Sequence, residues 1–142
     1  MPEKILIVED NPLHMRLLEM TLRDKNYTLL KATDGEEALD IAARERPDLI
    51  IMDIHLPEMN GFEATKNLRE NPAFSHTPII AITAYAMKGD RDRVIESGCD
   101  AYLTKPINTR ELPKVIAEML LHTRRATPSS NGDSNDKEDT GR

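Results

Sequence analysis

The sequence contains little cysteine and few aromatic residues, and these absences exclude several kinds of protein. Its 142 residues include one cysteine, Cys99, and no tryptophan, and aromatic residues make up 4% of the chain. A single cysteine cannot form a disulfide within the chain or a multi-cysteine metal site, and it is typical of a reducing cytoplasm. We interpret Cys99 as a small buried hydrophobic residue, because no neighbouring residue indicates activation of its thiol.

Long hydrophobic runs and an excess of positive charge are also absent. No segment is long and apolar enough to cross a bilayer, and the chain opens on Pro2, Glu3 and Lys4 rather than on the apolar region of a signal peptide. The formal net charge of -6 disfavours a main role in binding nucleic-acid phosphates. We therefore expect a cytoplasmic protein with no membrane association and no direct DNA binding, whose partners are proteins or cations.

Short apolar runs recur along the chain, and each is followed by a longer helical pattern. The runs are Ile5–Val8, Leu29–Leu30, Leu49–Met52, Ile79–Ile82 and Ala101–Leu103. The first, third and fourth runs are apolar at consecutive positions, as in parallel strands that helices cover on both faces. The length and the 39% hydrophobic content suit one core of ordinary size. The sequence therefore predicts a single α/β domain with a doubly wound sheet.

The helix after the first run carries two apolar stripes on nearly opposite sides. One stripe consists of Leu13, Leu17 and Met20, and the other of Met15, Leu18 and Leu22. One stripe must pack on the sheet. We expect the other to contact a neighbouring helix, and the alternative is a face that binds a partner.

The helical pattern stops after Leu121, and the residues from Thr127 onward include no large apolar side chain. Such a composition cannot bury enough apolar surface to order the chain. We expect a domain of residues 1–122 followed by a disordered polar tail of residues 123–142.

Carboxylates stand at the ends of two of the predicted strands. Glu9 and Asp10 close the first run, and Asp53 closes the third. In an open parallel sheet, ligands bind beyond the carboxyl ends of the strands, and the three acids converge there if these two strands are neighbours. Their mutual repulsion would raise a pKa or attract a cation, and a site made only of oxygen ligands suits Mg²⁺. The pattern therefore predicts a metal site.

Two groups that can bind phosphate follow the remaining strands of that edge. The fourth run ends at Thr83 and the fifth at Lys105, a hydroxyl and an ammonium that can both donate to phosphate oxygens. Singly, each of these residues has an ordinary structural explanation. Together, acids for Mg²⁺, a carboxylate free to attack, and two donors form the set that phosphoryl transfer requires. The histidines, His14 and His55 included, lack a zinc-like spacing, so we interpret none as an imidazole metal ligand.

The segments around these residues resemble the signature segments of response-regulator receiver domains. They read ILIVEDN, LIIMDIHLPEMNG, PIIAITA and GCDAYLTKPI, and the resemblance extends from Lys4 to about Leu121. Within the family, the chain is most similar to single-domain receivers of the bacterial cell-division regulator type and to receivers of hybrid histidine kinases. The resemblance implies a flavodoxin-like (βα)5 fold whose five-stranded parallel sheet has the strand order 2-1-3-4-5.

The same resemblance implies roles for individual acids. Asp53 would be the phosphoacceptor, and Asp10 and Asp53 would bind Mg²⁺ directly, together with the backbone carbonyl of His55. Glu9 would bind the ion through water. His55 also occupies a place that in the family tunes the loss of the phosphoryl group.

The remaining implied roles concern the phosphoryl group and the switch. Thr83 and Lys105 would hold the acyl phosphate, and a cis peptide bond before Pro106 would aim the lysine. Tyr102 matches the aromatic residue that turns inward when the hydroxyl of Thr83 follows the phosphate. The output would be a changed surface from about Ala84 to Tyr102.

The function that the resemblance implies is that of a stand-alone receiver in two-component or phosphorelay signalling. The donor would be a histidine kinase or a histidine phosphotransfer protein, and the output would be contact with a downstream protein target. The chain would catalyse only its own phosphotransfer and autodephosphorylation, so we expect a signalling protein rather than an enzyme, as a monomer or weak dimer.

Three alternatives were weighed against this function. A phosphatase of the haloacid-dehalogenase type needs a second aspartate two residues after the first, where this chain has His55, and also needs room for a cap domain. A flavodoxin-like electron carrier needs a hydroxyl-rich phosphate loop and aromatic residues that are scarce here. A receiver-like scaffold that works without phosphorylation stays open, although such domains usually lose the acidic site.

Overall fold

A five-stranded parallel sheet forms the centre of the protein in a computed structural model, which describes residues 2–56, 59–84 and 88–126. The strands lie in the order β2-β1-β3-β4-β5. Their bounds are β1 (Lys4–Val8), β2 (Thr28–Ala32), β3 (Leu49–Asp53), β4 (Ile79–Thr83) and β5 (Ala101–Thr104). The fold class and strand order expected from the sequence are confirmed.

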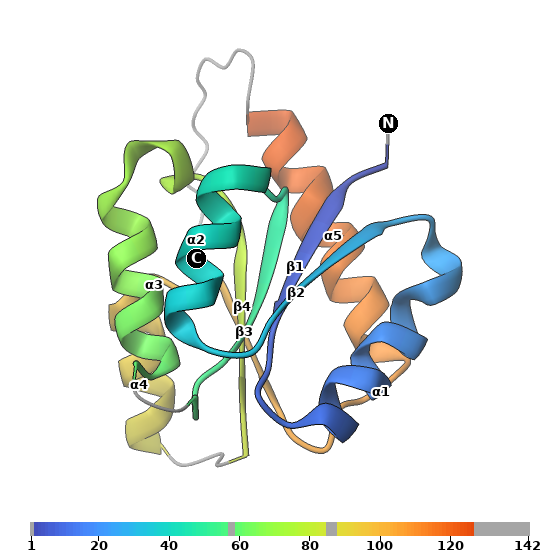
Figure 1. Ribbon diagram of the computed structural model, residues 1–142, viewed down its shortest axis with the longest axis horizontal. Coiled ribbons are helices and arrows are strands. Elements are labelled where there is room, and N and C mark those ends of the chain that lie inside the picture. The colour runs from blue at the N-terminus through green and yellow to red at the C-terminus, as the bar shows by residue number, and fades with distance from the viewer. Residues whose placement is uncertain (1, 57–58, 85–87, 127–142) are drawn as a thin grey trace.

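Helices cover both faces of this sheet, so the domain is doubly wound. The α-helices are α1 (Pro12–Leu22), α2 (Gly35–Glu45), α3 (Gly61–Glu70), α4 (Lys88–Ser97) and α5 (Glu111–Ala126), with short 3-10 turns η1 (Arg23–Lys25) and η2 (Pro72–Phe74). Helices α1 and α5 lie on one face, and α2, α3 and α4 lie on the other (Figure 1). None of the helices described is both long and apolar enough to span a membrane.

The last helix bears on the expected domain boundary. Helix α5 continues past residue 122 and ends at Ala126. The rest of the expected tail, residues 127–142, lies outside the described residues.

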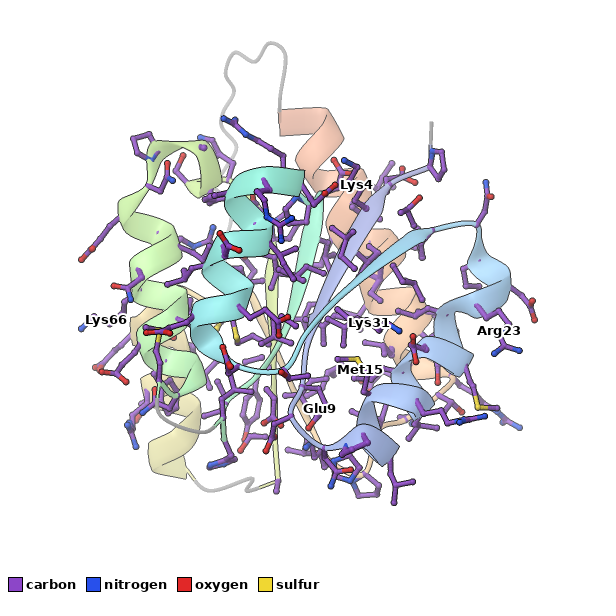
Figure 2. The ribbon with its side chains drawn as sticks, in the orientation of Figure 1. Lys4, Glu9, Met15, Arg23, Lys31 and Lys66 are labelled. Atoms are coloured by element: carbon purple, nitrogen blue, oxygen red, sulfur yellow. The ribbon has the colours of Figure 1, made fainter. Side chains whose placement is uncertain are left out.

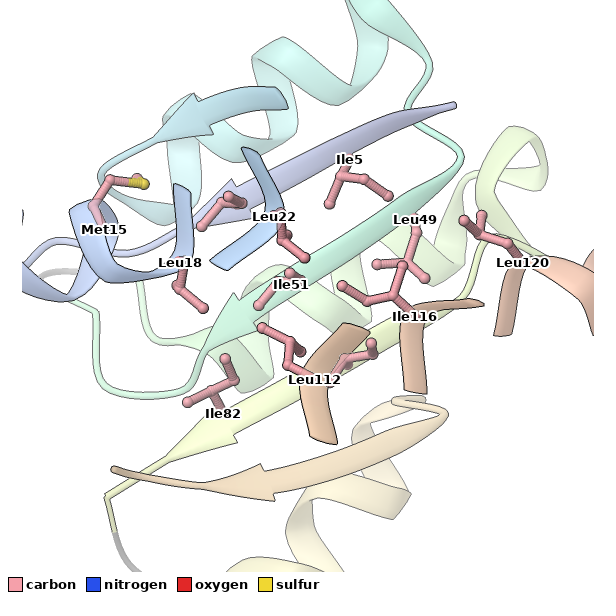
Figure 3. Packing of buried hydrophobic residues seen from close by; sticks show 12 residues of the cluster. Ile5, Met15, Leu18, Leu22, Leu49, Ile51, Ile82, Leu112, Ile116 and Leu120 are labelled. Carbon is pink, nitrogen blue, oxygen red and sulfur yellow. The ribbon is translucent and has the colours of Figure 1, made fainter. Parts of the chain in front are cut away.

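The uninterrupted apolar runs have a direct structural explanation. Successive side chains of a strand point to opposite faces of the sheet. Ile5 and Ile7 of β1 therefore pack with α1 and α5, whereas Leu6 and Val8 pack in the cluster beneath α2 and α3. Figure 3 shows Ile5 among the residues of the first cluster. All four side chains are at most 1% exposed. Because helices cover both faces, no position of this strand selects for a polar residue.

The two apolar stripes of α1 have different environments. Met15, Leu18 and Leu22 are buried against the sheet (Figure 3). The other stripe is exposed, with exposed fractions of 77% at Leu13, 37% at Leu17 and 56% at Met20. Our expectation that a neighbouring helix covers this stripe is wrong for the part of the chain that the structure describes. Helix α1 packs through its inner side only, and its outer side faces solvent.

The strand register aligns the ends from which the predicted site residues extend. Val8 pairs with Met52, so β1 and β3 end side by side. Asp53 pairs with Ile82, and Thr83 pairs with Thr104 at the ends of β4 and β5. The residues that follow these four adjacent strands therefore gather at one edge of the sheet.

Candidate functional site

Three carboxylates lie together at this edge. Glu9, Asp10 and Asp53 each offer an oxygen atom, and these atoms all lie within 4.8 Å of one another. Glu9 and Asp53 are 1% and 3% exposed, whereas Asp10 faces solvent. Figure 2 shows Glu9 at the end of β1, beside the start of α1. The topology thus brings together the three acids that the sequence placed at separate strand ends.

The burial of Glu9 changes its acidity. Desolvation is the main cause that raises its pKa from 4.5 to about 7. Asp53 adds to this shift, because it accepts a hydrogen bond from the protonated acid and repels the charged form. The backbone N–H of Asn11 and the charge of Lys105 lower the pKa without offsetting these effects. Without a cation, Glu9 is therefore partly protonated near neutral pH.

The hydrogen bonds of Glu9 indicate what the cluster can bind. Its Oε2 atom accepts a hydrogen bond from the backbone N–H of Asn11 at 3.1 Å. Its Oε1 atom is buried and has no hydrogen-bond partner within the described ranges. The Lys105 ammonium lies 3.2 Å from this oxygen as an ion pair without hydrogen-bond geometry, so the buried oxygen can still accept a hydrogen bond. Together with the oxygen-only set of ligands, this atom fits a site for Mg²⁺ and its bound water.

Lys105 reaches into the cluster from the end of β5. Its Nζ atom donates to Asp53 Oδ2 at 3.2 Å and forms an ion pair with Glu9 Oε1, also at 3.2 Å. It lies 3.0 Å from His14 Nδ1. Burial lowers the pKa of Lys105, but the charges of Asp53 and Glu9 outweigh that effect and raise the pKa overall. The lysine is therefore a fixed positive charge beside Asp53.

Thr83 and His55 connect the ends of β3 and β4. The side chain of Thr83 is fully buried, and its Oγ1 atom lies 3.2 Å from His55 Nε2. The backbone N–H of His55 donates to Asp53 Oδ1 at 2.9 Å. The backbone N–H of Lys105 donates to the carbonyl of Thr83 at 2.8 Å, and the Lys105–Pro106 peptide bond is cis. Asp53 thus accepts a hydrogen bond on Oδ1 from the backbone that follows its own strand and one on Oδ2 from Lys105 at the end of β5.

A cleft of about 440 Å³ opens beside the acids, toward α4. It is lined by Asp10, Ile54, His55, Leu56, Asn60, Phe62 and Arg93. The guanidinium of Arg93 lies 4.3 Å from the ring centre of Phe62. Tyr102 packs, partly buried, against the small cluster that contains Phe62. The predicted switch residue Tyr102 therefore packs beside Phe62, one of the residues that line the cleft.

The start of α3 holds the backbone that follows Asp53. Asn60 caps this helix through a capping box with Glu63, and the N–H of Gly61 donates to the carbonyl of Ile54 at 2.9 Å. A Cβ atom at Gly61 would lie 2.4 Å from the carbonyl oxygen of Asp53. Only glycine leaves room for the helix to approach the strand end this closely.

Sequence reasoning missed one residue of this site. We set His14 aside because its spacing suits no zinc site, yet the structure places it against Lys105. A signal was present in the sequence. Asn11 followed by Pro12 is a helix-start pattern, so a helix that begins directly after the acids must place its first turn over them.

The comparisons with known proteins agree on one family. The family model described as "Response regulator receiver domain" matches residues 5–117. The chain is 45% identical over 120 residues to the polar-differentiation response regulator DivK of Brucella anthropi, across 84% of this chain and 98% of that protein.

Solved structures give the same result. The receiver domain of the sensor histidine kinase PA1611 from Pseudomonas aeruginosa, which has a magnesium ion in its active-site cleft, matches with a TM-score of 0.79 and 37% identity. That match covers 84% of this chain and 98% of the other. The chemotaxis protein CheY4 of Vibrio cholerae matches with a TM-score of 0.80 and 32% identity, across 84% and 99% of the two chains.

Proposed function

Because the chain belongs to the response regulator receiver domain family of two-component signalling, we propose that it accepts a phosphoryl group on Asp53. The donor is the phosphohistidine of a histidine kinase or a histidine phosphotransfer protein. A carboxylate oxygen of Asp53 bonds to phosphorus as the P–N bond breaks, and the imidazole leaves with that electron pair. The chain catalyses this transfer and its own dephosphorylation, and no reaction on another substrate.

The environment of Asp53 is the observation that carries this proposal. Its carboxylate is buried at the centre of the acidic cluster, held by the His55 N–H on one oxygen and by Lys105 on the other. Two fixed donors orient the carboxylate, and positioning with charge stabilisation accounts for most of the catalysis of phosphoryl transfer.

The same groups support a role for Mg²⁺. We assign direct ligation to Asp10, Asp53 and the backbone carbonyl of His55, and ligation through water to Glu9, whose Oε1 atom has room for a donor. When bound, Mg²⁺ supplies positive charge for the crowded oxygens of the acids and the phosphoryl group.

Two further groups complete the set. Lys105, whose raised pKa keeps it charged, donates to a phosphoryl oxygen. The hydroxyl of Thr83 leaves His55 to do the same, and Tyr102 then moves inward at the α4 side. The output is contact with a downstream protein target.

The exposed stripe of α1 supports a docking surface for the phosphodonor. Leu13, Leu17 and Met20 lie on the helix that also carries His14 over the site. Grouped apolar side chains on a charged protein are typical of a surface that binds another protein. A donor that rests on this stripe has its phosphohistidine beside Asp53.

The setting of this activity is part of the same proposal. We assign a cytoplasmic, single-domain receiver whose last helix runs to Ala126, four residues beyond the expected boundary at 122, and which is active as a monomer or weak dimer. Direct DNA binding and membrane binding have no part in it, consistent with the negative net charge.

The deciding experiment measures intact mass after incubation with Mg²⁺ and acetyl phosphate. The wild-type protein should gain one phosphoryl group, and the gain should vanish in the Asp53→Asn variant and in EDTA. No gain in the wild-type protein, with the donor and the metal verified on another receiver, would instead favour a scaffold that works without phosphorylation.

A further inference from the structure

The contact between His14 and Lys105 has no role in the function proposed so far. Nδ1 of His14 lies 3.0 Å from Lys105 Nζ, which is shorter than the 3.2 Å between that ammonium and Asp53 Oδ2. A lysine ammonium has only donors. His14 must therefore accept through an unprotonated Nδ1 atom, with its own proton on Nε2.

The backbone around His14 is fixed before the side chain makes this contact. The Asn11 side chain accepts hydrogen bonds from the backbone N–H groups of Leu13 at 2.9 Å and of His14 at 3.2 Å. The backbone N–H of Asn11 in turn donates to Glu9 Oε2 at 3.1 Å. Hydrogen bonds thus connect Glu9 to Asn11, Asn11 to His14, and His14 to Lys105. The ion pair between Lys105 and Glu9 closes this ring of contacts.

The burial of the two side chains shows which one depends on the other. The side chain of Lys105 is 16% exposed, whereas that of His14 is 43% exposed and lies between the lysine and solvent. Asp53 and Glu9 hold the ammonium from within the cluster. His14 is the neutral acceptor that holds it from outside.

We propose that His14 is a positioning residue, which accepts one ammonium hydrogen of Lys105 and so aims the other two at Asp53 and at the phosphoryl group that Asp53 receives. This role rests on the proposed function. Without His14, the ammonium turns toward solvent, and fewer molecules hold it in the orientation that transfer requires.

The test compares two replacements of His14 that differ in one chemical property. His14→Leu removes the acceptor and keeps an apolar side chain that suits a helix, whereas His14→Gln keeps a neutral acceptor. The rate of phosphorylation by acetyl phosphate at saturating Mg²⁺ should fall about 10-fold or more in His14→Leu, the loss expected for one hydrogen bond from a charged donor. His14→Gln should recover most of that rate.

A second measurement is independent of phosphorylation. In metal-free protein with ¹⁵N-labelled lysine, the Lys105 ammonium should give a slowly exchanging NMR resonance that His14→Leu loses and His14→Gln retains. Equal rates and equal ammonium resonances in the wild type and His14→Leu would overturn the proposal, as would equal slowing in both variants. If the wild type accepts no phosphoryl group, the proposed function fails, and the ammonium resonance alone decides whether His14 holds the lysine.

Discussion

At the scale of single residues, the position of Asp53 depends on a glycine that carries no chemistry. Gly61 begins α3 where the helix passes over the end of β3, and a Cβ atom there would lie 2.4 Å from the carbonyl oxygen of Asp53 and 2.7 Å from Cα of Ile54. Both obstacles are backbone atoms, which cannot rotate away as a flexible side chain can. The strand end or the helix must therefore move.

We predict that Gly61→Ala destabilises the protein by about 1–3 kcal/mol, the usual cost of overpacking a rigid site, and also slows phosphorylation of Asp53. Gly35→Ala is the matched control. Gly35 begins α2 in the same way, but its nearest neighbours lie at 3.0 Å and two of them are side-chain atoms of Met59. Urea unfolding and acetyl phosphate labelling of both variants check this. Equal stability losses in the two would show that the approach of α3 to Asp53 is not the cause.

The sequence correctly predicted which residues lie together where a residue type and a strand end coincide, and the roles given to these residues stay predictions. Glu9, Asp10, Asp53 and Lys105 each follow an apolar run, and parallel topology alone brings such residues to one edge. His14 fails this criterion, because it lies within a helix and its contact depends on where the first turn begins. A contact between a helix and a distant strand end follows from packing, which periodicity does not encode.

At the scale of elements, the two apolar stripes of α1 have different roles in our proposal, one in folding and one in docking. Its inner stripe packs against the sheet, and its outer stripe is exposed beside the site. A charge on the outer stripe leaves folding intact but disrupts docking of an apolar partner surface.

We predict that Leu17→Asp lowers the rate of transfer from a phosphorylated histidine phosphotransfer domain at least about 10-fold, as expected when a contact of this kind is lost. Labelling by acetyl phosphate, which needs no docking, should stay within about 2-fold of the wild type. Ile95→Asp is the control, because Ile95 is 62% exposed on α4 and receives the same change. Loss of both activities in Leu17→Asp would indicate damage to the fold and contradict a docking role.

One arginine connects helix α3 to the segments that precede β4 and β5, at the end of the sheet opposite the acids. Arg69 Nε donates to the carbonyl of Gly98 at 2.9 Å, and its Nη1 donates to the carbonyls of Phe74 and Thr77 at 2.6 and 2.7 Å. Its Nη2 donates to Asp100 Oδ2 at 2.7 Å. The planar guanidinium serves all these acceptors at once, which a lysine ammonium cannot do.

Loss of this arginine should therefore destabilise the whole domain. We expect Arg69→Met to lower the free energy of unfolding by about 3 kcal/mol, because the carbonyls of Gly98, Phe74 and Thr77 lose the donors that Arg69 supplies. Asp100 Oδ2 keeps the backbone N–H of Ile79 as a donor at 2.8 Å. Arg69→Lys should recover little of that loss. In contrast, Arg44→Met, which removes an exposed ion pair with Asp40, should change stability by less than about 0.5 kcal/mol. Denaturant titrations of the three variants measure this, and a cost for Arg69→Met as small as that for Arg44→Met would contradict it.

The accuracy of strand prediction followed the continuity of each apolar run. The buried strands β1, β3 and β4 were located to within one residue at each end, because their apolar runs are continuous. Strand β2 was predicted as Leu29–Leu30 but spans Thr28–Ala32. It is an edge strand, so Thr28 and Lys31 face solvent and interrupt the pattern. In α1, the spacing of the apolar residues likewise does not show which of the two stripes is buried and which is exposed.

At the scale of the whole molecule, we expect the acidic site to make folding depend on pH and on Mg²⁺. The pKa of Glu9 rises from 4.5 to about 7 on folding without a cation. Between these values the folded chain binds more protons than the unfolded chain, so this contribution to stability is complete below about pH 4.5 and is lost as pH rises through 7. At about 1.4 kcal/mol per pKa unit, the loss reaches about 3 kcal/mol.

We therefore predict that the metal-free protein loses stability across this pH range and that Mg²⁺ restores it at the upper end. An Mg²⁺ concentration 100 times the dissociation constant stabilises a protein by about 2.7 kcal/mol, and the effect should be large at pH 8 and small at pH 5, where protons compete for Glu9.

Glu9→Gln is the control, because an amide keeps the shape of the side chain but cannot titrate. The pH dependence that remains in that variant belongs to other groups and is subtracted. Thermal unfolding from pH 4.5 to 8, with Mg²⁺ and with EDTA, provides the measurement. If the curves of the wild type and Glu9→Gln run parallel in EDTA, the carboxyl of Glu9 does not titrate in this window, and the link between its burial and Mg²⁺ binding fails.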